Sequence, residues 1–453
     1  MNISRIIKLN RRPPIQILSV GFILISLIGG ILLSLPVSSC SGEMTPFTDA
    51  VFTASSAVTT TGLIVVDTGS YYSMFGQIVI MILIQIGGLG YMLFFVFFVL
   101  LLGNELSMKS TLLLRESVKR PFTVEVTKFT IFIIAYTFIT ELVGAILLAF
   151  YLSKDFPLSE AIYSAIFHSI SAFNTAGFSI YVDSFVRYNN NILLHIIVNL
   201  ICIAGCIGFC VVFDSFEYIY NTIKKKRPNT LSVHSKLVYF ITIALSVTGT
   251  LIVYFAEYGD SDLSFKEKTL NSSFQVLTAV STTGFNTIDI GKMSETSLFL
   301  LTGLMFIGSG SGSTGGGIKI PTFGVLLSLL YSVLKQKEEV NIFKRRVSSE
   351  VIRHSLAIGL LSGLWMFIAT LVLSATKSGT FIQVLFEVGS ALGTVGLSTG
   401  ITANLTFIGK WVIIITMLIG RIGPLGIGLS VGLSLFKQQK DKYQYPIGDI
   451  YVG

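Results

Sequence analysis

The chain has 453 residues, of which 52% are hydrophobic and only 12% are charged, and its mean hydropathy is +0.77. A soluble domain carries about 25% charged residues, so this composition excludes a protein whose whole surface faces water. The formal net charge of +8 does not indicate nucleic-acid binding, because the basic residues are distributed as in a membrane protein.

Eight apolar stretches are long enough to cross a bilayer, which needs about 20 residues. Four of them carry no charge: Ile15–Pro36, Tyr72–Leu102, Leu237–Ala256 and Ser355–Thr376. Four more carry one ionisable residue each: Phe129–Ser153 with Glu141, Tyr188–Phe213 with His195, Thr296–Leu334 with Lys319, and Trp411–Phe436 with Arg421. Because Pro36 to Cys40 lacks a small-x-small cleavage site, we expect the first stretch to be a retained helix and not a signal peptide.

The basic residues set the predicted orientation. With eight spans both termini fall on one side, and that side carries 23 Lys and Arg against 7 on the other. They lie in the N-terminus, in Gly103–Lys128, Lys224–Lys236 and Lys335–Arg353, and in the C-terminal tail. Positive residues stay in the cytoplasm. We therefore expect a multi-pass protein of the cell membrane with both termini inside and a basic face toward lipid headgroups.

The spacing of the cysteine and histidine residues does not indicate a metal site or a catalytic site. Cys202, Cys206 and Cys210 recur every four residues along one face of a predicted membrane helix, which favours packing over a metal site or a disulfide. His168 and His195 are likewise expected to be packing residues. A membrane enzyme would need clustered histidines or carboxylates at membrane depth, and four scattered histidines do not supply them.

Four half-apolar segments between the spans are too short to cross. They are Met44–Leu63, Phe156–Phe178, Leu263–Phe285 and Ser378–Leu397. Aligned on Gly62, Gly177, Gly284 and Gly396, they share the pattern F-x3-[ST]-A-x2-T-x-G-[LF] at intervals of 115, 107 and 112 residues. Such a repeat predicts an all-α membrane protein of four tandem helix–pore-loop–helix units with pseudo-fourfold symmetry around one pore. We place the units at residues 14–103, 128–222, 235–334 and 352–436, followed by a cytoplasmic tail, residues 437–453.

The motif in each unit predicts a short helix followed by an extended turn at the glycine. Irregular backbone at membrane depth must be buried in protein or line water. The carboxyl end of a helix carries about half a negative charge, and glycine lets successive carbonyls turn toward one axis, where they can replace the water around potassium. The predicted filter segments are Thr60-Thr61-Gly62-Leu63, Thr175-Ala176-Gly177-Phe178, Thr282-Thr283-Gly284-Phe285 and Thr394-Val395-Gly396-Leu397. The alternative is a re-entrant helix that only packs.

Two details bear on selectivity. No copy has the second glycine of the T-V-G-Y-G potassium filter, so fewer carbonyl layers are fixed and selectivity is expected to be looser. Asp67, Asp183 and Asp289 follow their glycines by five or six residues, whereas the fourth copy has Ile401 and Thr402 there. These acids could form a broken ring that concentrates cations, or they could be solvated loop residues.

The four T-x-G-[LF] turns, a glycine-rich break in the third unit and the lone Arg421 resemble the Trk/Ktr/HKT potassium transporter superfamily over nearly the whole chain. The eight spans look like a KtrB-type membrane subunit. The resemblance implies a bacterial homodimer with one pore per protomer, gated by a cytoplasmic ring of RCK-type subunits. Any nucleotide would bind to that partner, and no cofactor is expected in this chain.

The predicted gate is the segment from Gly308 to Gly317. Its Gly310, Gly312 and Gly315 match G-x-G-x-x-G, but a membrane helix precedes them, so a dinucleotide site is not expected. Ten residues that disfavour a helix interrupt the sixth span, and the resemblance identifies them as a loop that closes the pore. The predicted gate residues are Gly308, Gly310, Gly312, Gly315, Gly316, Gly317, Lys319 and Arg421.

Intramembrane ionisable residues are functional candidates. One hypothesis is that Arg421 bonds loop carbonyls and adds a charge barrier below the filter; the alternatives are snorkelling or a structural pair with Glu141 or Asp214. Glu141 is expected to have a structural partner. The chain is thus predicted to take up potassium, with a less selective Na⁺/K⁺ pathway or a Na⁺-coupled symporter as the alternative. Glu141 alone is weak support for proton coupling.

Overall fold

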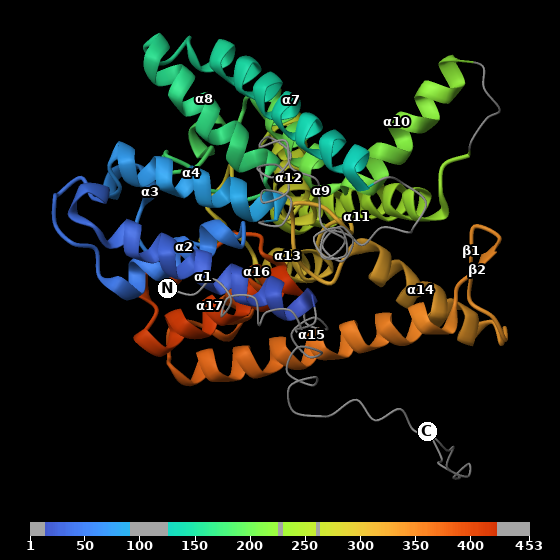
Figure 1. Ribbon diagram of the computed structural model, residues 1–453. Coiled ribbons are helices and arrows are strands. Elements are labelled where there is room, and N and C mark those ends of the chain that lie inside the picture. Colours follow the sequence, from blue (N-terminus) through green and yellow to red (C-terminus); the bar gives the residue numbers. More distant parts are fainter. Residues whose placement is uncertain (1–13, 91–125, 225–229, 260–262, 424–453) are drawn as a thin grey trace, which may run out of the picture.

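The computed structural model describes residues 14–90, 126–224, 230–259 and 263–423. The predicted basic N-terminus, most of the loop 103–128, the tail 437–453 and the far ends of two predicted spans lie outside these residues. The described part is almost entirely helical (Figure 1). Its one sheet is the hairpin of β1 (Asn341–Ile342) and β2 (Arg345–Arg346).

Each unit begins with a long apolar helix. These are α1 (Pro14–Ser34), α7 (Val126–Leu152), α11 (Val233–Tyr258) and α15 (Ser349–Ala375). All four are long and apolar enough to cross a membrane. Large hydrophobic side chains stay exposed on them, such as Ile28, Phe150 and Leu360, which is the pattern expected of helices that face lipid.

A short helix follows in each unit. These are α2 (Phe47–Val58), α8 (Leu158–Phe173), α12 (Phe265–Val280) and α16 (Phe381–Gly393). In α12 the Ser264 hydroxyl accepts from the Glu267 amide, while the Glu267 carboxylate accepts from the Ser264 amide. This capping box fixes the start of the helix. All four helices end within a few residues of a predicted filter glycine, as the sequence predicted.

The second long span of each unit contains a helix that ends near a glycine, and in units two and three a further helix follows. The helices are α4 (Met74–Leu89), α9 (Ile192–Cys206) with α10 (Phe209–Ile223), α13 (Glu295–Ile307) with α14 (Ile320–Leu334), and α17 (Phe407–Ile422). Just past the end of α4, α9, α13 and α17 stands a glycine with positive φ: Gly90 at 77°, Gly208 at 103°, Gly308 at 77° and Gly423 at 95°. Glycine adopts these conformations at low cost, so all four helices end in a similar way.

One sequence prediction is corrected here. The stretch Tyr188–Phe213 was predicted as one straight span, but α9 and α10 meet at a bend of 99°. Hydropathy does not reveal this bend, because Gly208 lies within apolar sequence. In the predicted span Tyr72–Leu102, α4 covers Met74–Leu89, and residues 91–102 lie outside the described part. Only the interruption between α13 and α14 was visible as a long glycine-rich run.

Short elements complete the ends of the units. They are η2 (Pro36–Ser38), α3 (Thr68–Tyr71), η3 (Val186–Tyr188), η4 (Ile290–Lys292) and η5 (Thr402–Asn404). The last four follow the filter segments and connect them to the second long helices.

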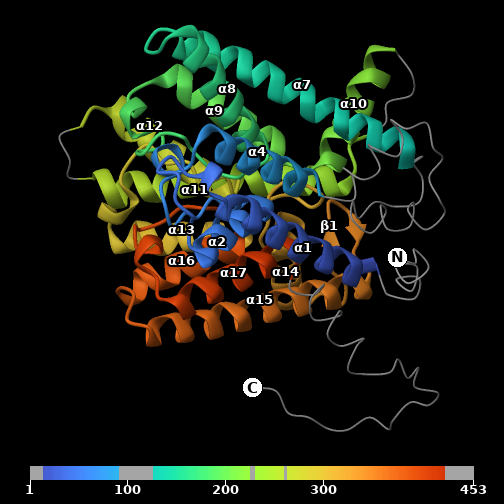
Figure 2. The same ribbon diagram turned by 60° about the vertical axis from the view of Figure 1, so that its left-hand side comes forward.

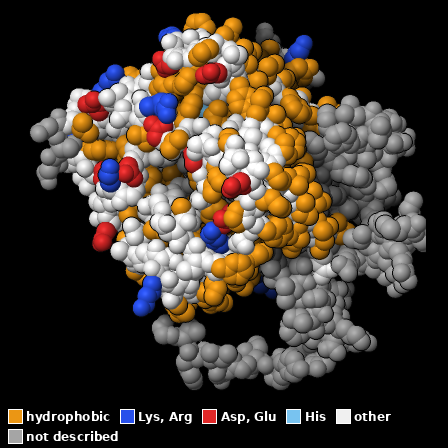
Figure 3. Space-filling model, turned by 90° about the vertical axis from the view of Figure 1, so that its left-hand side faces the viewer, with side chains coloured by type: hydrophobic (Ala, Val, Ile, Leu, Met, Phe, Trp, Pro, Cys, Tyr) orange, Lys and Arg blue, Asp and Glu red, His pale blue; other side chains and the backbone are white. Residues whose placement is uncertain are grey.

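The four units surround a common centre. In Figures 1 and 2 the blue, green, yellow and red parts of the chain form successive groups, and the red α17 lies against the blue α2. The first and last units therefore close the arrangement. On the face shown in Figure 3, most charged side chains lie toward the left, and a broad hydrophobic surface lies to their right. This surface suits contact with lipid.

Candidate ion pore

The four predicted filter segments meet in a closed ring. A Cβ added at Gly62 would lie 2.3 Å from the carbonyl oxygen of Ala176, and one at Gly177 would lie 2.2 Å from that of Thr283. One at Gly284 would lie 1.9 Å from the Val395 oxygen, and one at Gly396 would lie 2.1 Å from the Thr61 oxygen. Each glycine thus lies against the carbonyl that precedes the glycine of the next unit, in the order one, two, three, four, one. A side chain at any of the four would displace a neighbouring backbone.

The four segments share an unusual backbone. The threonines two residues before the glycines all have positive φ: Thr60 at 53°, Thr175 at 51°, Thr282 at 56° and Thr394 at 50°. A β-branched residue in this region costs about 1–3 kcal/mol, so surrounding contacts must hold it. All four threonines are fully buried.

Hydrogen bonds from each short helix supply those contacts. The amide before each glycine donates to the carbonyl of the motif serine or threonine: Thr61 to Ser56 at 2.8 Å, Ala176 to Ser171 at 2.8 Å, Thr283 to Thr278 at 2.9 Å and Val395 to Ser390 at 2.9 Å. The glycine amides of units one, three and four donate to the hydroxyl of the same residue at 3.0 Å. In unit two the Ser171 hydroxyl instead donates to the Phe178 carbonyl at 2.8 Å. The [ST] column of the repeat therefore fixes the turn.

Glycines in the second helices allow close packing on the short helices. A Cβ at Gly87 would lie 1.9 Å from the Val58 oxygen, and one at Gly205 would lie 1.8 Å from the Phe173 oxygen. Gly420 has the same relation to the Leu392 oxygen at 2.2 Å. The second helices of units one, two and four thus pack directly on the carboxyl ends of their short helices.

The glycine-rich segment 308–317 lies against the filter threonines. The Thr60 hydroxyl donates to the Thr314 carbonyl at 3.1 Å, and the Thr175 hydroxyl lies 3.3 Å from that of Thr314. A Cβ at Gly315 would lie 2.0 Å from the Thr282 hydroxyl, and one at Gly316 would lie 2.3 Å from that of Thr394. The loop therefore contacts all four units at once, and glycine at 315 and 316 permits this approach.

Two cations hold the loop. Arg421 donates to the Thr314 carbonyl and to the carbonyls of Gly87 and Gly88, the last at 3.0 Å. Lys319 donates to the Gly315 carbonyl and to the Ser309 hydroxyl at 3.2 Å. Arg421 thus bonds one carbonyl of the loop, as the hypothesis expected, and the proposed charge barrier stays a prediction. Arg421 joins unit four to the loop of unit three and to α4 of unit one.

The bend between α9 and α10 also supports the loop. The Gly310 amide donates to the Cys206 carbonyl at 2.9 Å, and the Phe209 amide donates to the Gly312 carbonyl at 2.8 Å. The Thr314 hydroxyl donates to the Phe173 carbonyl at 3.0 Å. The bend between α9 and α10 therefore brings backbone groups of both helices to the loop.

The alternative partners of Arg421, Glu141 and Asp214, bind elsewhere. Buried Glu141 accepts from Asn174 at 2.9 Å and from Gln85 at 3.3 Å, which confirms that it has structural partners. Asp214 accepts from the Ser235 hydroxyl at 2.7 Å.

The three acids outside the filter have local partners. Asp67 accepts from the Ser70 amide at 2.7 Å and caps α3. Asp183 pairs with Arg187 at 2.9 Å, and Asp289 pairs with Lys292 at 3.2 Å. In Asp183 and Asp289, 37% and 56% of the side chain is exposed. These contacts favour solvated loop residues over a dedicated cation ring.

Sequence reasoning missed one set of residues. The position after each motif phenylalanine holds a buried polar side chain: Thr53, His168, Gln275 and Glu387. His168 was expected only to pack, yet it bonds Ser179 next to the second filter segment at 2.9 Å. This column varies in identity but stays polar in every copy, which was the signal available in the sequence.

Comparisons with known proteins agree with this geometry. The family model of TrkH, described as a cation transport protein, matches residues 4–437. The chain belongs to the TrkH family of cation transport proteins. It is 38% identical to the Ktr system potassium uptake protein B of Bacillus subtilis, with 99% of each chain covered. It is 35% identical to the potassium/sodium uptake protein NtpJ of Enterococcus hirae, with 98% of each covered.

The fold is also found in a solved structure. The potassium transporter TrkH from Vibrio parahaemolyticus matches with a TM-score of 0.69 at 20% sequence identity, covering 92% of this chain and 85% of that one. The helical membrane fold predicted from the sequence is confirmed. The family is one of transporters, which confirms the expectation that the chain is not an enzyme.

Proposed function

We propose that this chain is the membrane subunit of a bacterial potassium uptake system and that potassium passes through the ring formed by the four filter segments. The ring itself carries the proposal. Four carbonyls, those of Thr61, Ala176, Thr283 and Val395, lie at equivalent places around one closed circuit. Two full-length relatives at 38% and 34% identity are named Ktr system potassium uptake protein B, from Bacillus subtilis and Vibrio alginolyticus.

The selectivity step follows from this geometry. Four backbone carbonyl oxygens at one level can replace part of the hydration shell of a monovalent cation. The short helices α2, α8, α12 and α16 end at the ring, and each carboxyl end adds a partial negative charge that favours a cation. In this proposal, the filter consists of one segment from each of the four units: residues 60–63, 175–178, 282–285 and 394–397.

The gate is the loop 308–317, held by Lys319 and Arg421. The loop lies against the four filter threonines, so an ion leaving the ring on that side meets Thr314, Gly315 and Gly316. Transport requires the loop to move away, and Arg421 must then release the Thr314 carbonyl. Its positive charge also opposes a cation below the ring.

Partners would bias this movement from the cytoplasm. We propose that the chain forms a homodimer and that a cytoplasmic ring of nucleotide-binding, RCK-type subunits controls the loop. The names of the relatives, which describe a Ktr system, support a transport system with more than one component. In this proposal the nucleotide binds to the partner, and this chain carries only the transported ion.

A second candidate is a pathway that also passes sodium. It is favoured by the NtpJ relative, which is named a potassium/sodium uptake protein, and by the missing second glycine in all four filter segments. A Na⁺-coupled symporter would show potassium uptake that stops when sodium is replaced by choline.

The experiment is growth of a potassium-uptake-deficient bacterium at low potassium, with the chain alone or with a cytoplasmic partner subunit. We expect growth to be restored and to increase with the partner. Ion-replacement flux measurements in the same cells separate the candidates, since a selective pore takes up potassium with or without sodium. Failure of the expressed, membrane-inserted chain to restore growth under both conditions would overturn the proposal.

A further inference from the structure

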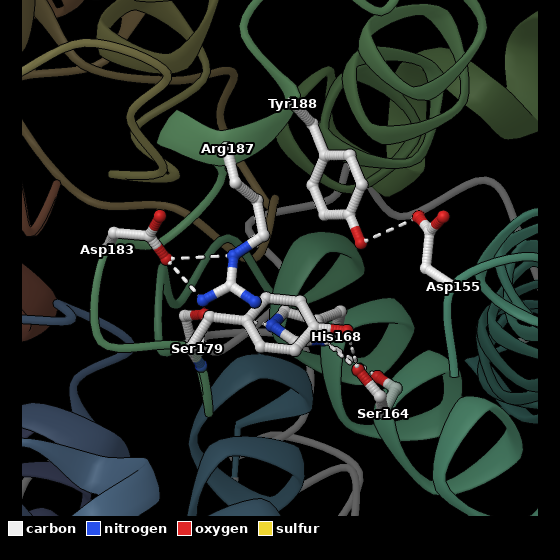
Figure 4. Close-up of polar contacts among 8 residues, drawn as sticks. Asp155, Ser164, His168, Ser179, Asp183, Arg187 and Tyr188 are labelled. Atoms are coloured by element: carbon white, nitrogen blue, oxygen red, sulfur yellow. Dashed lines mark hydrogen bonds and ion pairs between the residues drawn. The ribbon is translucent and has the colours of Figure 1, made fainter. Parts of the chain in front are cut away.

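The position after each motif phenylalanine connects a short helix to the chain that leaves the filter. In unit two the His168 Nε2 lies 2.9 Å from the Ser179 hydroxyl, and Ser179 directly follows the filter segment. In unit three the Gln275 amide donates to the Thr287 hydroxyl at 3.1 Å. Figure 4 shows His168 between Ser164 and Ser179 in this arrangement. In unit one Thr53 accepts instead from the Tyr72 hydroxyl at 3.2 Å.

Unit four makes this connection most strongly. Glu387 is fully buried in α16. One carboxylate oxygen accepts from the Ser398 hydroxyl at 2.6 Å, the Thr399 amide at 2.9 Å and the Thr399 hydroxyl at 3.3 Å. The other accepts from the Thr402 hydroxyl at 2.7 Å. Residues 398–402 begin directly after the fourth filter segment, so one side chain organises the whole outer connection.

Burying the Glu387 carboxylate costs free energy, which a side chain with a purely structural role would not need to spend. A buried carboxylate loses its hydration and recovers it only through hydrogen bonds, and all four donors to Glu387 are neutral. The site also lies where the repeat departs from its pattern. Unit four has Ile401 and Thr402 where the other units have an acid, and Glu387 reaches Thr402 from behind.

The contacts of Glu387 lie where the second filter glycine is missing. In T-V-G-Y-G filters a second glycine shapes the outer carbonyl layer, whereas here Ser398 and Thr399 follow Leu397. We propose that Glu387 is a specificity-determining positioning residue that fixes residues 398–402 behind the fourth filter segment and thereby sets the preference of the pore for potassium over sodium. This inference rests on the proposed function, because it concerns the same ring.

The test compares variants of the purified full chain in detergent, using calorimetric titration with KCl and with NaCl. The measured quantity is the ratio of the sodium Kd to the potassium Kd. Glu387→Ala removes all four bonds and leaves their donors without this acceptor, so we expect the ratio to fall roughly tenfold. Glu387→Gln should stay within about twofold of the wild type, because its amide oxygen can accept where the Ser398 and Thr399 donors lie and its amide nitrogen can donate to the Thr402 hydroxyl.

The matched control is Glu257→Ala. Glu257 accepts three hydrogen bonds, from the Ser294 amide and the Ser294 and Ser297 hydroxyls, but it supports the start of α13 and not a filter segment. Its loss should leave the ratio unchanged. If Glu387→Ala does not fold, Ser398→Ala and Thr402→Val each remove one partner and should lower the ratio about threefold.

Three outcomes overturn the inference: an unchanged ratio in Glu387→Ala or, failing that, in both single-partner variants; an equal fall in Glu387→Gln, which would assign the effect to charge; or an equal fall in Glu257→Ala. Potassium uptake by deficient cells that express the unsubstituted chain tests the proposed function separately. Wild-type uptake with an unchanged binding ratio in the variants would defeat only the inference, whereas absent wild-type uptake would defeat the function.

Discussion

The filter segments keep the fourfold symmetry of the repeat, whereas the second helices depart from it. At the filter, the four units have nearly the same threonine and glycine conformations and form a closed ring of like contacts. In the second helices, the glycine after α13 of unit three begins a loop that contacts every filter threonine, whereas the glycine after α9 of unit two is followed by the helix α10. In the proposed function, symmetry is kept where an ion is coordinated from all sides and is lost where a single element closes the path.

The largest expected effect comes from breaking the symmetric region. In Gly284→Ala the new Cβ would lie 1.9 Å from the Val395 carbonyl oxygen, and φ at this position is 91°. Both features force the ring apart, so we expect potassium uptake into potassium-depleted cells to be abolished. Gly303→Ala in α13 is the control, since nothing lies within 4 Å of its added Cβ. Normal uptake by Gly284→Ala would show that the ring does not conduct.

The next effect comes from the asymmetric region. Arg421→Ala removes the bonds to Thr314 and to the carbonyls of Gly87 and Gly88, together with a positive charge below the ring. Without a regulatory subunit we expect uptake to rise about tenfold, since charge-assisted hydrogen bonds contribute about 1.5–3 kcal/mol. Tracer uptake by the chain alone measures this. Arg187→Ala, which removes an exposed ion pair, is the control, and unchanged uptake in Arg421→Ala would discard the barrier role.

A smaller effect tests how strictly the filter units are equivalent. Ser56→Ala removes the hydroxyl that accepts from the Gly62 amide at 3.0 Å, whereas Ser171→Ala removes a donor to the Phe178 carbonyl. Each loses one neutral bond, worth about 1 kcal/mol, so we expect the potassium-to-sodium uptake ratio to fall roughly fivefold in both. Ser273→Ala, whose hydroxyl donates to the Leu270 carbonyl of its own helix, is the control. Wild-type ratios in both filter variants would contradict a role of the [ST] column in selectivity.

The smallest effect is expected outside the ring. In Asp289→Asn the loop loses its pair with Lys292, which is exposed on both sides. Exposed pairs contribute about 0–1 kcal/mol, so we expect uptake to change by no more than about twofold at low ionic strength and less at high salt. Uptake measured at two ionic strengths checks this. A loss as large as that of a filter variant would restore the interpretation of the three acids as a cation ring.

The sequence alone determined the membrane class, the fourfold repeat and the ring residues. These follow from local features: uncharged stretches of sufficient length, and a glycine turn that needs the same residues wherever it occurs. Arg421 and the loop 308–317 also stood out, because a charge or a glycine run is conspicuous in apolar sequence.

Only the tertiary structure decided the order of contacts around the ring, the 99° bend between α9 and α10, and the hydrogen bonds of His168 and Glu387. The loop at Gly310 and Gly312 bonds the backbone on both sides of Gly208, and these contacts join parts of the chain that are far apart in sequence. Glu387 likewise has its role only through donors 11 to 15 residues away in the chain. Local pattern fixes what each unit can form, whereas contacts between units decide which of those possibilities the assembled pore uses.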